Sequence, residues 1–141
     1  MPLPDPTRLR EAARAERVGN AAAAAKEMAH QRAVAAAEKP ALRARLDAEA
    51  HDGIERDKTA GRLTFHFGEA AYVFSKKDPA YLAKVEVREE VVRAFVAEAR
   101  KRGGYRVSAR KVDFESDAMA DAMGSPPERG TAWDITIRWK T

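Results

Sequence analysis

Large apolar side chains are concentrated in the second half of this chain. Residues 1–60 contain four Leu, two Val, one Ile and no Phe, which is 7 of 60 positions. Residues 61–141 contain 17 such residues in 81 positions, together with all three Tyr and both Trp. A segment in which these residue types make up less than about 20% rarely buries enough apolar area to fold alone. We therefore predict two parts, an arm over residues 1–60 and a compact domain over residues 61–141.

Helix-forming residues dominate the arm, and ten of the seventeen residues from 21 to 37 are Ala. Asp5 followed by Pro6 is typical of a helix start. The Gly19–Asn20 pair is expected to interrupt this helix and to cap the next one. Pro40 is expected to end or kink the second helix, because its ring clashes with the preceding turn. The arm is therefore predicted to hold two or three helices, with breaks near Gly19 and Pro40.

The arm has few large side chains to bury. Alanine on nearly every face lets the axes of two helices approach to about 8–10 Å or less. Apolar residues also recur at four-residue steps from Leu42 to Ile54, which gives one narrow apolar stripe. We expect the arm to pack on other protein subunits, or on copies of itself, through its larger apolar side chains, which are Met28, Val34, Leu42, Leu46 and Ile54.

The second part begins with a pattern typical of a β-strand. Apolar residues alternate with polar ones between Leu63 and Phe67, as a half-buried strand requires. The following residues, Gly68–Ala70, are predicted to form a turn into a second strand over residues 71–75. These two strands would form a hairpin.

A helix is predicted over residues 89–102, because basic residues fill its last turn and Gly103–Gly104 follows it. Its buried stripe is expected to consist of Val92, Phe95, Val96 and Ala99. Residues 80–88 stay open between strand and helix. The Asp78–Pro79 pair before them is typical of a helix start, whereas their own alternation of apolar and polar residues is typical of a strand.

Residues 105–114 and 132–140 are predicted to be the last two strands. One face of the final strand is expected to point at the helix, and it carries Trp133, Ile135, Ile137 and Trp139. The expected fold class is α+β, with an alanine-rich helical arm followed by a small antiparallel sheet of about four strands packed on one main helix.

Basic side chains gather on the other face of the predicted sheet. If the strands pair, this face holds Arg106, Arg110, Arg138, Lys140 and His66. A cationic face of this kind can hold a phosphate backbone. It has no aromatic platform for stacking single-stranded bases. The pattern therefore favours a solvated outer face, with nucleic-acid binding as the alternative.

A long connection between the last two strands is rich in acidic residues and methionine. Its acidic residues are Asp113, Glu115, Asp117 and Asp121. A calcium loop requires Gly where Ala118 stands and a Glu at its end, so the pattern does not fit that site. Met119 and Met123 lie one helical turn apart, and they are expected either to dock a partner or to pack on the protein's own core.

No pattern typical of an active site or a metal centre is present. The spacing of His30, His51 and His66 does not put two of them on one helix face or one strand. No Ser lies in a nucleophile elbow, no glycine loop resembles a phosphate cradle, and there is no Cys. We therefore expect a non-enzymatic protein with no catalytic residues, no metal and no cofactor. An enzyme whose site is assembled only by the fold is a further hypothesis.

Charge and hydropathy narrow the function further. The net charge is +4, from 26 basic and 22 acidic residues, whereas nucleic-acid binders usually have a larger basic excess. No apolar run approaches a signal-peptide core or the ~20 residues of a membrane span, so a cytoplasmic protein, or one assembled into a particle from a cytoplasmic pool, is expected. The favoured hypothesis is a structural assembly protein of the kind found among phage virion components. The alternative is a nucleic-acid-associated accessory protein that uses the cationic sheet face.

Overall fold

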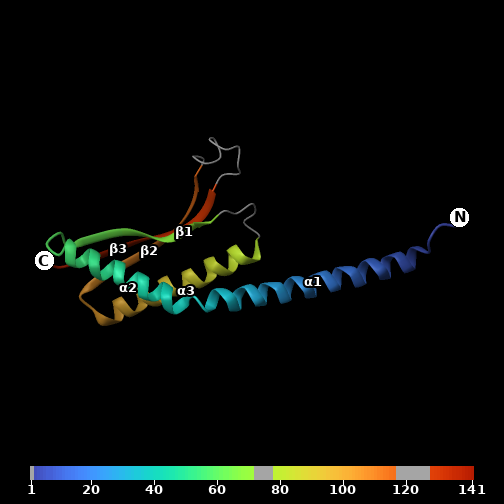
Figure 1. The fold of residues 1–141 in the computed structure, drawn as a ribbon, viewed down its shortest axis with the longest axis horizontal. Helices are drawn as coiled ribbons and strands as arrows, with labels where there is room; N and C mark the ends of the chain where they lie inside the picture. The colour runs from blue at the N-terminus through green and yellow to red at the C-terminus, as the bar shows by residue number, and fades with distance from the viewer. Residues whose placement is uncertain (1, 72–77, 117–127) are drawn as a thin grey trace.

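The computed structural model describes residues 2–71, 78–116 and 128–141 of the chain. In these residues three helices and three strands follow one another as α1 (Pro6–Ala36), α2 (Lys39–Arg56), β1 (Arg62–Ala71), α3 (Pro79–Arg102), β2 (Tyr105–Ser116) and β3 (Glu128–Trp139). Figure 1 shows α2 and α3 beside the sheet and α1 extending away from both. The fold class is therefore α+β, as predicted.

The three strands of the described residues form one antiparallel sheet in the order β1-β3-β2. The predicted turn at Gly68–Ala70 is wrong, because β1 continues through it. Gly68 lies opposite Ala132, and pairing with β3 extends to Ala71 opposite Arg129. Apart from Ala71, the predicted second strand lies outside the described residues.

Helix α3 resolves the question that the sequence left open over residues 80–88, which are helical. The Asp78 side chain accepts a hydrogen bond of 2.9 Å from the backbone N–H of Ala80, and Pro79 lies in the first turn. Ala83, Val87 and Val91 are buried at four-residue steps, so the helical period places them on one face. The helix ends at Gly103, whose φ of 77° is in the left-handed region that favours glycine.

The core lies between the sheet and a layer made by α2 and α3. Trp133, Ile135 and Ile137 of β3 are buried, and Trp139 is half-buried against the same cluster, so the prediction for this face is confirmed. The predicted stripe of α3 is also confirmed, since Val92 and Phe95 are buried and its other two members pack against the core. Helix α2 adds three more buried side chains, which are Leu42, Leu46 and Ala50.

The predicted break at Gly19 is wrong, because α1 is one helix from Pro6 to Ala36. A single Gly costs about 1 kcal/mol in a helix interior, and the long alanine run beside it is the best helix former known. The break near Pro40 is confirmed in a different form. The chain turns at residues 37–38, and Pro40 lies in the first turn of α2. Proline is tolerated there because a backbone N–H in the first turn makes no hydrogen bond within the helix.

Replacing Gly19 with Ala is expected to strengthen α1 without changing the rest of the fold. A Cβ atom at this position would meet no other atom within 4 Å. The gain in helix propensity of about 0.5–1 kcal/mol should raise the hydrogen-exchange protection of residues 10–25 by about two- to fivefold. Amide exchange measured by mass spectrometry checks this, and a change of more than about 1 °C in the Tm would contradict it.

Candidate functional site

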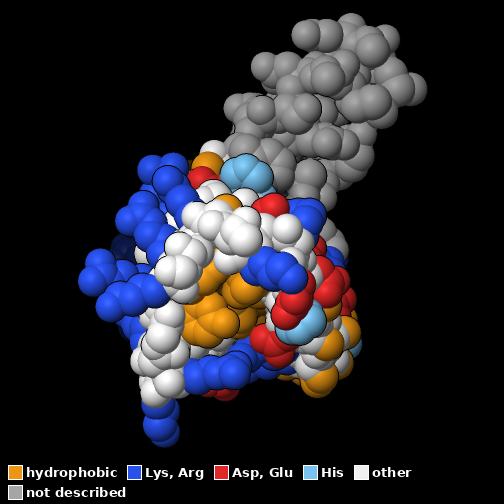
Figure 2. Space-filling model, turned by 90° about the vertical axis from the view of Figure 1, so that its left-hand side faces the viewer, with side chains coloured by type: hydrophobic (Ala, Val, Ile, Leu, Met, Phe, Trp, Pro, Cys, Tyr) orange, Lys and Arg blue, Asp and Glu red, His pale blue; other side chains and the backbone are white. Residues whose placement is uncertain are grey.

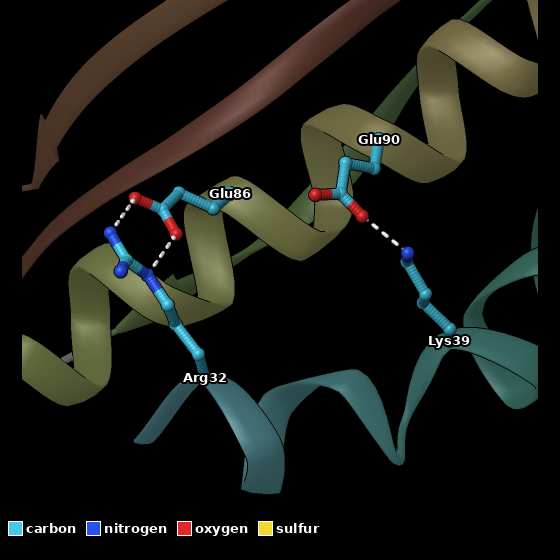
Figure 3. A network of polar contacts seen from close by, with 4 residues as sticks. All are labelled: Arg32, Lys39, Glu86 and Glu90. Atoms are coloured by element: carbon cyan, nitrogen blue, oxygen red, sulfur yellow. Dashed lines mark hydrogen bonds and ion pairs between the residues drawn. The ribbon is translucent and has the colours of Figure 1, made fainter. Parts of the chain in front are cut away.

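The C-terminal part of α1 is anchored on α3, and this anchor fixes the direction of the rest of the helix. Ala35 is 2% exposed, and Met28 packs against the core. Arg32 donates two hydrogen bonds to the Glu86 carboxylate, at 3.0 and 3.3 Å, and these bonds raise the pKa of Arg32 above its usual value. Lys39 at the start of α2 forms an ion pair with Glu90, also on α3 (Figure 3).

The N-terminal part of α1, residues 6–27, is exposed at every position, and we call it the projecting segment. At 1.5 Å per residue it extends about 33 Å from the anchor (Figure 1). Its largest apolar side chains stand in solvent, with Leu9 54% and Val18 65% exposed. The 22 residues of this segment, out of 73 in the three described helices, therefore bury no face against the described residues.

One face of α1 is lined by small apolar side chains, and we call it the small-residue face. Its members alternate at steps of three and four residues, and they are Ala15, Val18, Ala22, Ala25 and Ala29. This spacing is that of the a and d positions of a coiled coil. Four of its five members are Ala, so a second helix could lie against this face at a short interaxial distance.

Two of the residues expected to dock a partner are buried in the protein's own core. Leu42 is 7% exposed and Leu46 is fully buried, because α2 packs its apolar stripe on α3 and β1 rather than on a partner. Ile54 and Met28 are half-buried against the same core. Val34 is the one predicted residue of the arm that is half exposed, at 50%. Met119 and Met123 lie outside the described residues, as do Asp117 and Asp121.

The predicted cationic face forms on the side of the sheet that the helices leave uncovered. The register places its side chains in three cross-strand rows, which are Arg62–Arg138–Arg106, Thr64–Thr136–Ser108 and His66–Asp134–Arg110. Lys140 follows β3 directly and is exposed. All five residues predicted for this face therefore lie on or beside it. Arg62 was missed, although the alternation that places His66 on this face also places Arg62 there.

The charges of this face are paired in one row and not in another. The Asp134 carboxylate contacts Nδ1 of His66 and forms an ion pair of 3.5 Å with Arg110. In the part of the chain that the structure describes, no carboxylate lies within 4.0 Å of the side-chain nitrogens of Arg62, Arg106 or Arg138. Figure 2 shows Lys and Arg side chains gathered along the left-hand edge of the molecule.

A hollow of about 590 Å³, which was not predicted from the sequence, opens between α2, α3 and the sheet. Its apolar lining includes Ile54, Phe95 and Tyr105, and hydrophobic side chains are visible in it near the centre of Figure 2. Charged side chains surround the opening, among them Arg43, which forms ion pairs with Asp47 and Glu98. Burial lowers the pKa of Arg43, but the hydrogen bonds to these two carboxylates outweigh it and raise the pKa overall.

The described residues contain no group of three or more His, Asp or Glu side chains placed to hold a metal ion. Among the same residues, no helix combines the length and the apolarity needed to cross a bilayer.

The projecting segment and the sheet face are therefore the two candidate binding surfaces among the described residues. Neither can be assigned through a relative. No protein-family model, no curated protein sequence and no solved structure was found to match the chain.

Proposed function

We propose that this chain is a non-enzymatic assembly protein whose folded body presents α1 to a protein partner. The observation that carries the proposal is the exposure of every residue of the projecting segment. Helices in proteins gain most of their stability from packing an apolar face, and the projecting segment packs no face on the described residues. A partner that covers the segment would supply the missing packing.

The anchor on α3 supports a role in holding a partner at a set position. Two ion-paired contacts, Arg32 with Glu86 and Lys39 with Glu90, join the helices where the segment leaves the body. The direction of the segment is therefore fixed before a partner binds, which lowers the entropy lost on binding. A component of a larger complex, such as a phage virion, must contact its neighbouring subunits, and a segment held in a fixed direction can make such a contact.

The small-residue face supports a helix as the structure that the segment contacts. Ala22 and Ala25 lie at its centre, one a-to-d step apart. Small residues at these positions let the two backbones come close, so that dispersion contacts form along the whole length. A second copy of α1 meets this requirement, and so does a helix of another subunit.

The double variant Ala22→Glu/Ala25→Glu is expected to abolish association through the projecting segment. Two carboxylates would be buried at the helix contact, and each unpaired buried charge costs several kcal/mol. The matched control is Ala23→Glu/Ala24→Glu, which has the same composition and charge but lies on the opposite side of the helix. Sedimentation velocity at 10–100 µM compares the full chain, both variants and the chain without residues 1–27.

The expected result is that the full chain and the control associate, while the other two chains are monomers. The same four chains serve as baits for proteins of the source cell. A full chain that is monomeric throughout this range, and that captures no protein through contacts sensitive to Ala22→Glu/Ala25→Glu, would contradict the proposal.

A further inference from the structure

Three arginines lie directly opposite one another on the uncovered face of the sheet. Arg138 of the central strand lies between Arg62 and Arg106, and all three side chains are exposed. Like charges at directly opposed positions destabilise a sheet. No described carboxylate within ion-pair distance relieves this repulsion. A bound anion would therefore relieve the repulsion among these three arginines and stabilise the fold.

The row next to the arginines supplies neutral hydrogen-bond donors. Thr64, Thr136 and Ser108 lie side by side, and the hydroxyls of the two threonines are 3.5 Å apart. Neighbouring rows on one face are about 6.8 Å apart, and neighbouring strands about 4.8 Å. These short side chains lie between the arginine row and the row of His66, Asp134 and Arg110, in which Asp134 contacts both of its neighbours. Guanidinium and hydroxyl groups are the donors that proteins use on phosphate oxygens.

The composition of the face decides which phosphate-bearing ligand fits it. None of the nine residues in the three rows is Phe, Tyr or Trp, and the next row along the sheet is Gly68, Ala132 and Val112. The one aromatic ring of the face is the imidazole of His66, which contacts Asp134. Single-stranded nucleic acids are held by stacking successive bases on several aromatic side chains, which this face does not offer. A duplex keeps its bases stacked inside and presents phosphates outside. We infer that this face binds the phosphate backbone of double-stranded nucleic acid, without reading its sequence.

This binding site is independent of the proposed assembly role, because it lies on the sheet and not on α1. Its central residue is Arg138, which has an arginine on each side. Each arginine that neutralises a phosphate contributes about −0.9 to the slope of log K against log salt concentration. Three arginines therefore predict a slope of about −3 for the full chain, and Arg138→Gln should reduce its magnitude by about 0.9.

The experiment is fluorescence anisotropy with a labelled 20-base-pair DNA duplex at 50, 100 and 200 mM NaCl. Two variants that lose one positive charge each, as Arg138→Gln does, serve as controls. Arg93→Gln removes an exposed arginine of α3 that is paired with Glu89, and Arg14→Gln removes one from the projecting segment. We expect neither control to change the slope, whereas Arg62→Gln/Arg106→Gln/Arg138→Gln should abolish binding at 100 mM NaCl. The Tm of this triple variant should not fall, because the substitutions remove repulsion.

Three results would overturn the inference. The first is no binding of the duplex at 50 mM NaCl. The second is an equal loss of slope in Arg14→Gln or Arg93→Gln, which would place the contact elsewhere or make it a general charge effect. The third is equal or tighter binding of a single strand of the same length, which would show that the face does not prefer a duplex. The same measurement with a duplex RNA of equal length shows which of the two phosphate backbones, DNA or RNA, the face binds more tightly.

Discussion

A chain that lacks residues 1–60 is expected to be unfolded, whereas a chain that lacks only residues 1–27 should keep the unfolding transition of the full chain. The two chains differ by residues 28–60, which hold the anchor of α1 on α3 and the whole of α2. Its side chains Leu42 and Leu46 are 7% and 0% exposed, and each Leu lost from a core costs about 2–5 kcal/mol. Two such losses approach the whole stability of a small domain, which is about 5–15 kcal/mol.

Helix α2 also covers aromatic side chains that would otherwise face water. The guanidinium of Arg45 lies 4.9 Å from the ring centre of Phe67, and that of Arg43 lies 5.6 Å from the ring centre of Phe95. Gly53 lets the helix come close to Leu63, since a Cβ atom there would meet the Leu63 side chain at 2.6 Å. Without α2, the apolar surface of β1 and α3 would be exposed, which favours aggregation over folding.

Thermal unfolding followed by near-ultraviolet circular dichroism and tryptophan fluorescence measures the outcome. Trp133 is 3% exposed, so its emission reports whether the core is formed. The chain without residues 1–27 is the control, because every residue that it loses and the structure describes is exposed. A cooperative transition with a protected Trp133 in the chain of residues 61–141 would show that α2 is dispensable.

This expectation differs from the two-part division drawn from composition, and the reason is physical. Residues 39–56 are poor in large apolar side chains, yet the few that they have lie at four-residue steps on one face. A narrow stripe is enough when the surface that it meets is already apolar, as the sheet and α3 are here. Composition counts how much a segment can bury, but the spacing of Leu42, Leu46 and Ala50 determines where it packs.

The face of each strand followed from alternation, while the order of the strands did not. Alternation placed Trp133 and Ile135 inward and Arg138 outward, because successive side chains of a strand point to opposite faces. The cross-strand arginine row requires β3 to lie between β1 and β2. Arg62 and Arg138, which pair across β1 and β3, are 76 positions apart in the sequence. The hollow beside Phe95 depends in the same way on three elements that only the fold brings together.

Replacing Gly68 with Ala is expected to destabilise the fold by about 3 kcal/mol or more, which corresponds to a fall of roughly 10 °C in the Tm. Gly68 lies in β1 opposite Ala132, and its backbone φ of 149° is one that residues other than glycine rarely adopt. A Cβ atom at this position would lie 2.7 Å from the carbonyl oxygen of Thr131 and 2.8 Å from Cα of Ala132. Both atoms belong to the backbone of the central strand, so neither can move without disturbing the pairing.

The sequence prediction placed a turn at Gly68, because glycine between two apolar runs is a common turn signal. Glycine inside a strand has a second meaning, the close approach of another backbone, and this is the meaning that the structure supports. The two meanings predict different results for Gly68→Ala, since a surface turn would tolerate the change within about 1 kcal/mol. Chemical denaturation of Gly68→Ala beside Gly19→Ala, where the new methyl group meets nothing, separates them. An equal and small effect at both positions would mean that Gly68 does not face the backbone of β3.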